Sequence, residues 1–402
     1  MSSFRTASRE AAQVLLNDES LSRSTLWTYF VAEFPEATGL LPAGVTEATH
    51  SMVCVPGKAL LRVAGTAPDD ESVDPTALDP AVEGGLRDWA LHMRRTGFPS
   101  AEYPRAAKLY QDLIASMLGH ELDERVARTL EEFGEVMRSA AEQADQKGIP
   151  AASAAQVTSV IEASSFEGAP AAARTRIVRL ETSTPIPYEP GQVVPVLQAN
   201  RQGVWHDLAP ALPYNELGQL EFHVREELDV EVGDYVTLGA AYGTAPLRGV
   251  DKRPGHRLLI VADGTGLAAA KAMVFDLMER DERPEVELMI GVEHEDEFYD
   301  LHTFASLTSS SEVHDWLTIT CVAEQVMDPE DPESPAIVEG LRRVWIGVER
   351  LASATGTWWG RDVVICGSVA RCTLITDAMK EAGAPTPTVV AMDEEADWFN
   401  EH

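Results

Sequence analysis

Two glycines close to the middle of the chain lie where backbone amides could bind phosphate. An apolar run, Leu258 to Val261, precedes a short turn that holds Gly264, Thr265 and Gly266, and an alanine-rich helical pattern follows. A strand, a glycine turn and a helix in this order leave N–H groups and the positive end of a helix dipole facing one point. The segment predicts either a pyrophosphate site or an ordinary tight turn of an α/β domain, because two glycines alone do not separate the two.

The composition excludes several classes of partner. The 402 residues carry a formal net charge of −33, spread along the chain. Nucleic acids and anionic membranes would be repelled by this charge, so we expect neither as a partner. The four cysteines follow neither metal-ligand spacing nor a disulfide framework, which is typical of a reducing compartment. No apolar run approaches the roughly 18 residues of a membrane span or follows a signal-peptide pattern, so a cytoplasmic protein is expected.

Periodicity divides the chain into a helical part and two parts that contain strands. Residues 1–147 show helical spacing almost throughout, although Pro56-Gly57 predicts a kink or break within one helix. Residues 148–170 are small, polar and proline-bearing, and we expect a linker or the edge of a new domain there. Short strands within 171–252 predict a small antiparallel barrel. Alternating strands and helices within 253–402 predict a parallel sheet in an α/β domain.

Three motifs in this order resemble those of the flavohaemoglobins, in which a globin is fused to a ferredoxin-reductase-like module. Pro190-Gly191-Gln192 is similar to the family's PGQ turn, Asp263-Gly264-Thr265-Gly266 to its AGxG turn, and Cys366-Gly367-Ser368 to its CGP motif. The resemblance implies a globin-like haem domain over 1–147, a barrel of the FAD-binding type over 171–252, and an α/β domain of the NAD-binding type over 253–402.

The resemblance also implies haem b in the helical domain. Trp89-Ala90-Leu91-His92 and then Tyr103 are similar to the family's proximal histidine, which would bind iron, and the tyrosine beside it. Trp27 falls at the position of the family's distal tyrosine, and His50 falls near its distal glutamine. His50 would donate a hydrogen bond to bound oxygen, or would instead cap the start of a broken helix. A histidine on a helix is, however, more often an ordinary surface or core residue than a ligand.

The reductase part departs from the family pattern. The RxYS run, whose arginine meets the flavin pyrophosphate and whose tyrosine packs on the ring, corresponds to His206-Asp207-Leu208-Ala209. The acidic side chains of Glu226, Glu227 and Asp229 would then oppose the pyrophosphate. FAD is therefore doubtful. Acidic residues after the next strand, at Glu293, Glu295 and Asp296, favour NADH over NADPH if either nucleotide binds.

Three functions remain open from the sequence. The first is flavohaemoglobin-like oxidoreductase chemistry on O2 and NO, with nitric oxide dioxygenation as the reaction the family implies and an external reductase as an electron donor. The second is a sensor or storage protein for haem or gas whose reductase module serves as a scaffold. The third is an NADH-dependent reductase without haem. Trp398-Phe399 would cover a flavin in the first case or simply anchor the C-terminus.

Overall fold

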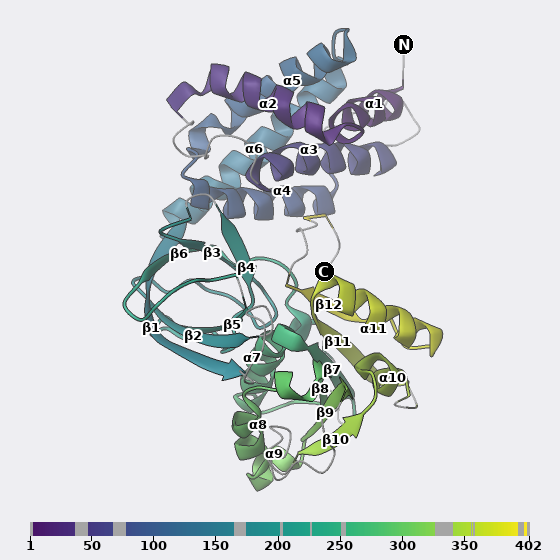
Figure 1. The fold of residues 1–402 in the computed structure, drawn as a ribbon. Coiled ribbons are helices and arrows are strands. Elements are labelled where there is room, and N and C mark those ends of the chain that lie inside the picture. The colour runs from purple at the N-terminus through teal and green to yellow at the C-terminus, as the bar shows by residue number, and fades with distance from the viewer. Residues whose placement is uncertain are drawn as a thin grey trace. The chain divides into compact units, whose positions relative to one another are not determined.

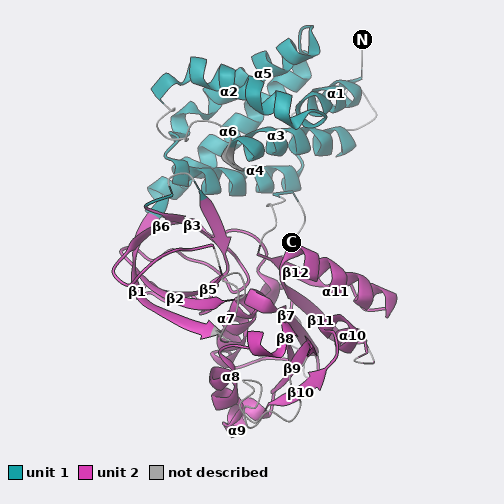
Figure 2. Cartoon of the chain, in the orientation of Figure 1, with its two compact units in different colours: residues 1–152, 200–204, 396–402 teal, residues 153–199, 205–395 magenta. Residues whose placement is uncertain are grey.

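The computed structural model describes eleven stretches of the chain, which form two compact units (Figure 2). One unit comprises residues 1–152, 200–204 and 396–402, and the other comprises 153–199 and 205–395. The described residues are 3–36, 47–66, 78–164, 174–201, 204–225, 227–250, 255–325, 341–354, 356, 358–392 and 398–399.

The first unit is all-helical, as the periodicity predicted (Figure 1). Carboxylates cap several of its helices, because Asp18, Asp79 and Asp123 each accept a hydrogen bond from a backbone N–H of the following first turn. The apolar faces of the helices meet in one core that also includes Phe399. The helices are α1 (Phe4–Leu16), α2 (Glu19–Glu33), α3 (Glu47–Thr66), α4 (Pro80–Met93), α5 (Tyr103–Leu118) and α6 (Glu124–Gln146).

Helix α3 is continuous through Pro56, where the sequence predicted a kink or break. Burial offsets the loss of one backbone hydrogen bond, since Val53, Val55 and Leu60 around the proline are all nearly inaccessible to solvent. Gly57 allows α3 to pack closely against Leu16 at the end of α1, because a Cβ at this position would lie 2.8 Å from the Leu16 side chain. The Pro-Gly pair thus permits close contact between α1 and α3 instead of ending a helix.

An antiparallel six-stranded sheet opens the second unit, in the spatial order β4-β3-β6-β1-β2-β5. Its first strand occupies 152–164, so the linker expected over 148–170 is corrected, whereas the edge of a new domain expected there agrees with the division between the units after Ala152. The small residues there alternate between buried and exposed sides of the strand, a period that the alanine-rich composition concealed. The strands are β1 (Ala152–Ser164), β2 (Thr175–Thr182), β3 (Val194–Gln198), β4 (Trp205–Leu208), β5 (Gln219–Val224) and β6 (Tyr235–Gly239).

A parallel six-stranded sheet follows in the same unit, in the order β10-β9-β8-β7-β11-β12. Every pair of neighbouring strands in it is parallel, which confirms the α/β prediction. The strand order reverses direction between β7 and β11. The strands are β7 (Arg257–Asp263), β8 (Glu285–His294), β9 (Leu317–Gln325), β10 (Arg342–Trp345), β11 (Arg361–Gly367) and β12 (Thr388–Ala391).

Five α-helices accompany this sheet within the described residues: α7 (Leu267–Met278), α8 (Leu301–Thr308), α9 (Ser311–His314), α10 (Val348–Ser353) and α11 (Val369–Glu381). Helix α7 follows the glycine turn at the carboxyl end of β7, as the sequence indicated. None of the helices in the described stretches combines the length and the hydropathy needed to cross a bilayer.

Candidate functional site

The helical unit contains an apolar cavity with about 820 Å³ of empty space, counting its open mouth. Five helices and the turns between α4 and α5 supply its walls. The lining residues are Leu26, Phe30, Met52, Pro56, Leu86, Trp89, Met93, Thr96, Phe98, Tyr103, Ala106, Ala107, Leu109, Tyr110, Leu130, Phe133, Gly134 and Met137.

His92, the residue expected to bind iron, does not line this cavity. The cavity face of α4 carries Leu86, Trp89 and Met93, which share one side of the helix by their spacing of three and four residues. The neighbouring position, His92, turns its imidazole toward Trp398 at a ring-centroid distance of 4.8 Å, and its Nε2 contacts Nη1 of Arg95. Burial, and then the Arg95 charge, lower the pKa of His92 well below its usual value, so the ring is neutral.

The other expected haem contacts are scattered. Only Tyr103 lines the cavity. Trp27 stacks on Phe30 at 6.2 Å, and His50 bonds to Glu19. Leu41, which falls near the position where the family packs a phenylalanine against haem, lies outside the described residues.

The residues that line the cavity can be compared with the ligands that haem iron requires. Among the residues that the structure describes, neither a histidine nor a cysteine borders the cavity, so it presents iron with no imidazole and no thiolate. The residues therefore do not fit a haem held by His92.

Two buried polar atoms in the cavity wall have no hydrogen-bond partner among the described residues. They are the hydroxyl of Tyr103, whose residue is 6% exposed, and Nε1 of Trp89, whose residue is 4% exposed. By contrast, the hydroxyl of Tyr110 in the same wall donates to the Met52 carbonyl at 2.5 Å. An unsatisfied buried polar group costs about 1–3 kcal/mol. Burial also raises the pKa of Tyr103 above its ordinary value, although Arg94 opposes this shift, so the hydroxyl stays protonated.

Two of the four barrel residues aligned with the flavin motif, Leu208 and Ala209, belong to the protein's own core. Leu208, at the place of the tyrosine that would pack on the flavin ring, is 6% exposed and packs among the barrel strands. Ala209, which replaces the motif's hydroxyl residue, is buried as well. His206 pairs with Val196 across β4 and β3, at the place of the motif's arginine. Glu226 lies outside the described residues. These side chains do not fit the flavin contacts that the resemblance implied.

The turn motif Pro190-Gly191 has a structural explanation. Gly191 has φ of 97°, and a Cβ there would lie 2.4 Å from Cδ of Pro246. Gln192 secures the turn, because its Oε1 accepts from the Glu189 amide at 2.9 Å. The motif therefore holds two loops of the barrel together, whether or not a flavin binds.

The predicted phosphate turn lies at the point where the parallel sheet reverses its strand order, the usual crevice for ligands of such folds. Gly264, Thr265 and Gly266 form a 3₁₀ turn, and Gly264 has φ of 55°. A Cβ on Gly266 would lie 2.2 Å from the Cys366 carbonyl oxygen, so the glycine is required by contact with β11. Cys366 and Gly367 close the other side of the crevice. Burial raises the pKa of the Cys366 thiol well above its ordinary value.

An ion-pair network occupies this crevice. Oδ2 of Asp263 accepts from Nη2 of Arg371 at 2.9 Å and from its Nε at 3.1 Å. The same guanidinium binds Glu324 at 2.8 Å. Burial, the largest influence, raises the pKa of Asp263, and the hydrogen bond from Arg371 opposes it. The arginine that could hold a pyrophosphate is thus already neutralised by carboxylates.

A second network, which the sequence did not reveal, is buried between strand β5 and helices α7 and α8. Nζ of Lys271 donates to Glu221 at 2.7 Å and to Asp300 at 2.5 Å. Glu221 is also 3.1 Å from Nε2 of His223, whose Nδ1 lies 2.9 Å from the Tyr299 hydroxyl. Burial tends to raise the pKa of Glu221, but hydrogen bonds from His223 and the charge of Lys271 together lower it. The single signal in the sequence was a lysine within an alanine-rich helix.

Comparisons with known proteins agree with this architecture. No protein-family model matches the chain. It is 27% identical over 142 residues to the reductase component of phenol 2-monooxygenase from Pseudomonas sp. (strain CF600), covering 33% of this chain and 39% of that protein. It is 25% identical over 140 residues to the phenol hydroxylase P5 protein of Acinetobacter pittii (strain PHEA-2), covering 32% of this chain and 38% of the relative. The chain spans about two fifths of the length of these curated relatives.

Among the solved structures that are similar to the chain, a flavohaemoglobin matches over nearly its whole length. It is the flavohaemoglobin from Malassezia yamatoensis with bound FAD and haem, at a TM-score of 0.62 and 13% identity, covering 95% of this chain and 98% of that one. The chain therefore has the flavohaemoglobin fold, a globin-like domain followed by a ferredoxin-reductase-like module. At this identity the likeness establishes the fold alone.

Proposed function

We propose that this chain is a ligand-binding protein with flavohaemoglobin architecture, in which the helical domain binds an apolar small molecule without iron. The reductase-like module serves as its scaffold. The proposal retains the sensor or storage function that the sequence left open, but the ligand is an organic molecule instead of haem or a gas. Haem-based nitric oxide dioxygenation, together with an external electron donor, is not part of the proposal, because His92 lies away from the cavity.

The observation that carries the proposal is the pair of partnerless polar atoms in an otherwise apolar wall. Tyr103 and Trp89 both line the cavity, and the hydroxyl of the first and the indole N–H of the second are buried without a hydrogen-bond partner among the described residues. Both donate hydrogen bonds, so the complementary ligand has an apolar body and an acceptor such as a carbonyl or ether oxygen. Such a ligand would accept one or two hydrogen bonds from these protein atoms, which lose their hydrogen bonds to water when the chain folds.

A matched pair of probes tests this function. 2-Acetylnaphthalene and 2-isopropenylnaphthalene have nearly the same shape, and only the ketone carries an acceptor oxygen. We expect the full-length protein to bind the ketone about 2- to 10-fold more tightly, since one hydrogen bond contributes about 0.5–1.5 kcal/mol. Calorimetry or quenching of tryptophan fluorescence gives both dissociation constants.

Two tyrosine variants make the test specific. Tyr103→Phe should abolish most of the preference for the ketone. Tyr110→Phe should retain the preference, because the Tyr110 hydroxyl is already bonded to Met52. Failure of both probes to bind, or a preference that persists in Tyr103→Phe and Trp89→Phe, would contradict the proposal.

A second candidate function is an NADH-dependent reductase. The two curated relatives are named as a reductase component of an oxygenase and as a phenol hydroxylase protein, which supports this candidate. The strand, glycine turn and helix over Arg257–Met278 also support it. Against it stand the neutralised Arg371 and the core position of Leu208. Oxidation of NADH by the purified protein with added FAD and ferricyanide would establish this candidate over the first.

A further inference from the structure

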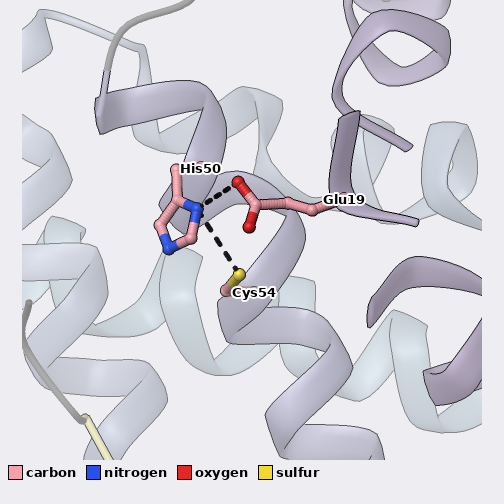
Figure 3. A group of neighbouring side chains, drawn as sticks. All are labelled: Glu19, His50 and Cys54. Carbon is pink, nitrogen blue, oxygen red and sulfur yellow. Dashed lines mark hydrogen bonds and ion pairs between the residues drawn. The ribbon is translucent and has the colours of Figure 1, made fainter. Parts of the chain in front are cut away.

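Three side chains with metal-binding atoms converge between α2 and α3, outside the cavity wall (Figure 3). Glu19 lies in the first turn of α2, and His50 and Cys54 are four residues apart on α3, which places both on one side of that helix. Their carboxylate oxygen, imidazole nitrogen and sulfur all lie within 4.8 Å of one another. Figure 3 shows Nδ1 of His50 facing both the carboxylate and the sulfur.

We propose that Glu19, His50 and Cys54 bind one zinc ion, with water in the fourth position. Carboxylate, imidazole and thiolate are the three zinc-binding groups of proteins, and three protein ligands plus water are a common zinc arrangement. The ion would join the start of α2 to α3. Neither the flavohaemoglobin resemblance nor the cavity proposal depends on this site.

The distances are close to those of a bound ion. With zinc–sulfur bonds of about 2.3 Å and zinc–nitrogen bonds of about 2.05 Å, a tetrahedron separates sulfur from nitrogen by about 3.5 Å. In the structure Sγ of Cys54 lies 3.8 Å from Nδ1 of His50. Oε1 of Glu19 lies 2.5 Å from the same nitrogen, a hydrogen bond that must open to about 3.3 Å as the metal replaces the proton.

The local chemistry agrees with a cation at this point. The side chains of His50 and Glu19 are 23% and 37% exposed, whereas Cys54 is buried, so an ion has a solvent path and a sheltered sulfur. Arg23 competes for the site, because its Nη1 binds Oε1 of Glu19 at 3.0 Å.

A second cluster of similar residues, in the other unit, already contains a positively charged side chain. Glu221, His223 and Asp300 also bring ligand atoms within 4.8 Å. There Nζ of Lys271 lies 2.7 Å from Glu221 and 2.5 Å from Asp300. The ammonium group of this lysine therefore occupies the position that a metal ion would take between the carboxylates. In the Glu19 cluster the described contacts with a charged nitrogen come from Arg23, which binds the carboxylate of Glu19.

Cobalt(II) is the probe that tests the site in the full-length, reduced and chelator-treated protein. We expect one cobalt ion per chain with a near-ultraviolet thiolate-to-cobalt charge-transfer band, and release of cobalt by zinc. Cys54→Ser should abolish the band. His50→Gln and Glu19→Gln should each weaken cobalt binding at least 10-fold. The matched controls, Cys321→Ser and His120→Gln, remove a buried cysteine and an exposed histidine outside the cluster and should bind as the wild type does.

Two further measurements do not depend on whether a ligand variant folds. Arg23→Gln retains all three ligands and removes the competing cation, so it should bind cobalt more tightly than the wild type. X-ray absorption of the zinc-loaded wild type should show one sulfur at about 2.3 Å with nitrogen and oxygen neighbours. Absence of the thiolate band in the wild type, an unchanged band in Cys54→Ser, or a zinc shell without sulfur would overturn the proposal.

Discussion

The imidazole of His92 packs against the indole of Trp398, with ring centroids 4.8 Å apart and planes inclined by 55°. Phe399 follows in the core of the same helical unit, where a Cβ on Gly85 would collide with it. The C-terminal aromatic pair therefore anchors to the helices, one of the two roles that the sequence left open. Its first member contacts the side chain that the family resemblance assigned to iron.

Acidification should destabilise the protein below about pH 6.5. Burial lowers the pKa of both His92 and His223 beneath their usual 6.5. Below pH 6.5 these two histidines therefore bind protons in the unfolded chain but stay neutral in the folded chain. The stability that these two residues contribute is complete above pH 6.5 and decreases as the pH falls. Urea titrations at pH 7.5 and pH 5.5 measure the difference in unfolding free energy. A His223→Gln variant should show a smaller difference than the wild type, and an equal one would contradict the assignment.

Breaking the buried network at Lys271 should cost far more stability than breaking a surface pair. Lys271→Met leaves Asp300 without its ion-pair partner and leaves Glu221 with Arg179 as its remaining cation, which we expect to cost about 3–5 kcal/mol. Arg280→Gln removes a more exposed pair with Asp276 and should cost below about 1 kcal/mol. Urea unfolding of the two variants measures both values. A similar cost for the two changes would show that the network contributes little.

Removing the Asp263 carboxylate should increase affinity for NADH. Asp263→Ala frees part of the Arg371 guanidinium and removes one negative charge from the crevice, so a pyrophosphate meets less repulsion. We expect the dissociation constant for NADH to fall several-fold in a fluorescence titration. Glu285→Ala removes an exposed carboxylate at the opposite end of the parallel strands and serves as the control. Equal affinity in all three proteins would mean that the ion pair does not restrict the crevice.

Filling the cavity should exclude the ligand while leaving the reductase-like module intact. Ala106 is a partly buried wall residue, and Ala106→Phe would place a ring in the space. We expect binding of 2-acetylnaphthalene to weaken at least 10-fold, with unchanged circular dichroism. Unaltered binding would place the probe elsewhere on the protein.

Local patterns in the sequence predicted the fold well, because strand and helix periods are properties of neighbouring residues. The strand, turn and helix from Arg257 to Met278 are an example. Strand β1 was missed because its alternation is carried by alanine, serine and threonine, which also compose linkers. Pro56 led to the wrong prediction of a kink or break, whereas the helix is continuous because packing against distant residues outweighs the local effect of the proline.

The sites were harder to predict because their geometry depends on single positions and distant partners. His92 and Met93 are adjacent in sequence, yet only Met93 lines the cavity. No spacing rule could pair Glu221 with Lys271, fifty residues apart, or His50 with Glu19 across two helices. Tyr103 was named from the family resemblance as a neighbour of a ligand, whereas the structure gives it a polar atom of its own in the wall.

A haemin titration of the wild type and His92→Ala, followed by absorption spectroscopy, tests most directly whether His92 binds iron. We expect the same weak spectrum for both proteins, without the sharp Soret band of an imidazole-ligated iron. A sharp Soret band in the wild type that disappears in His92→Ala would contradict this expectation, because His92 would then reach the iron.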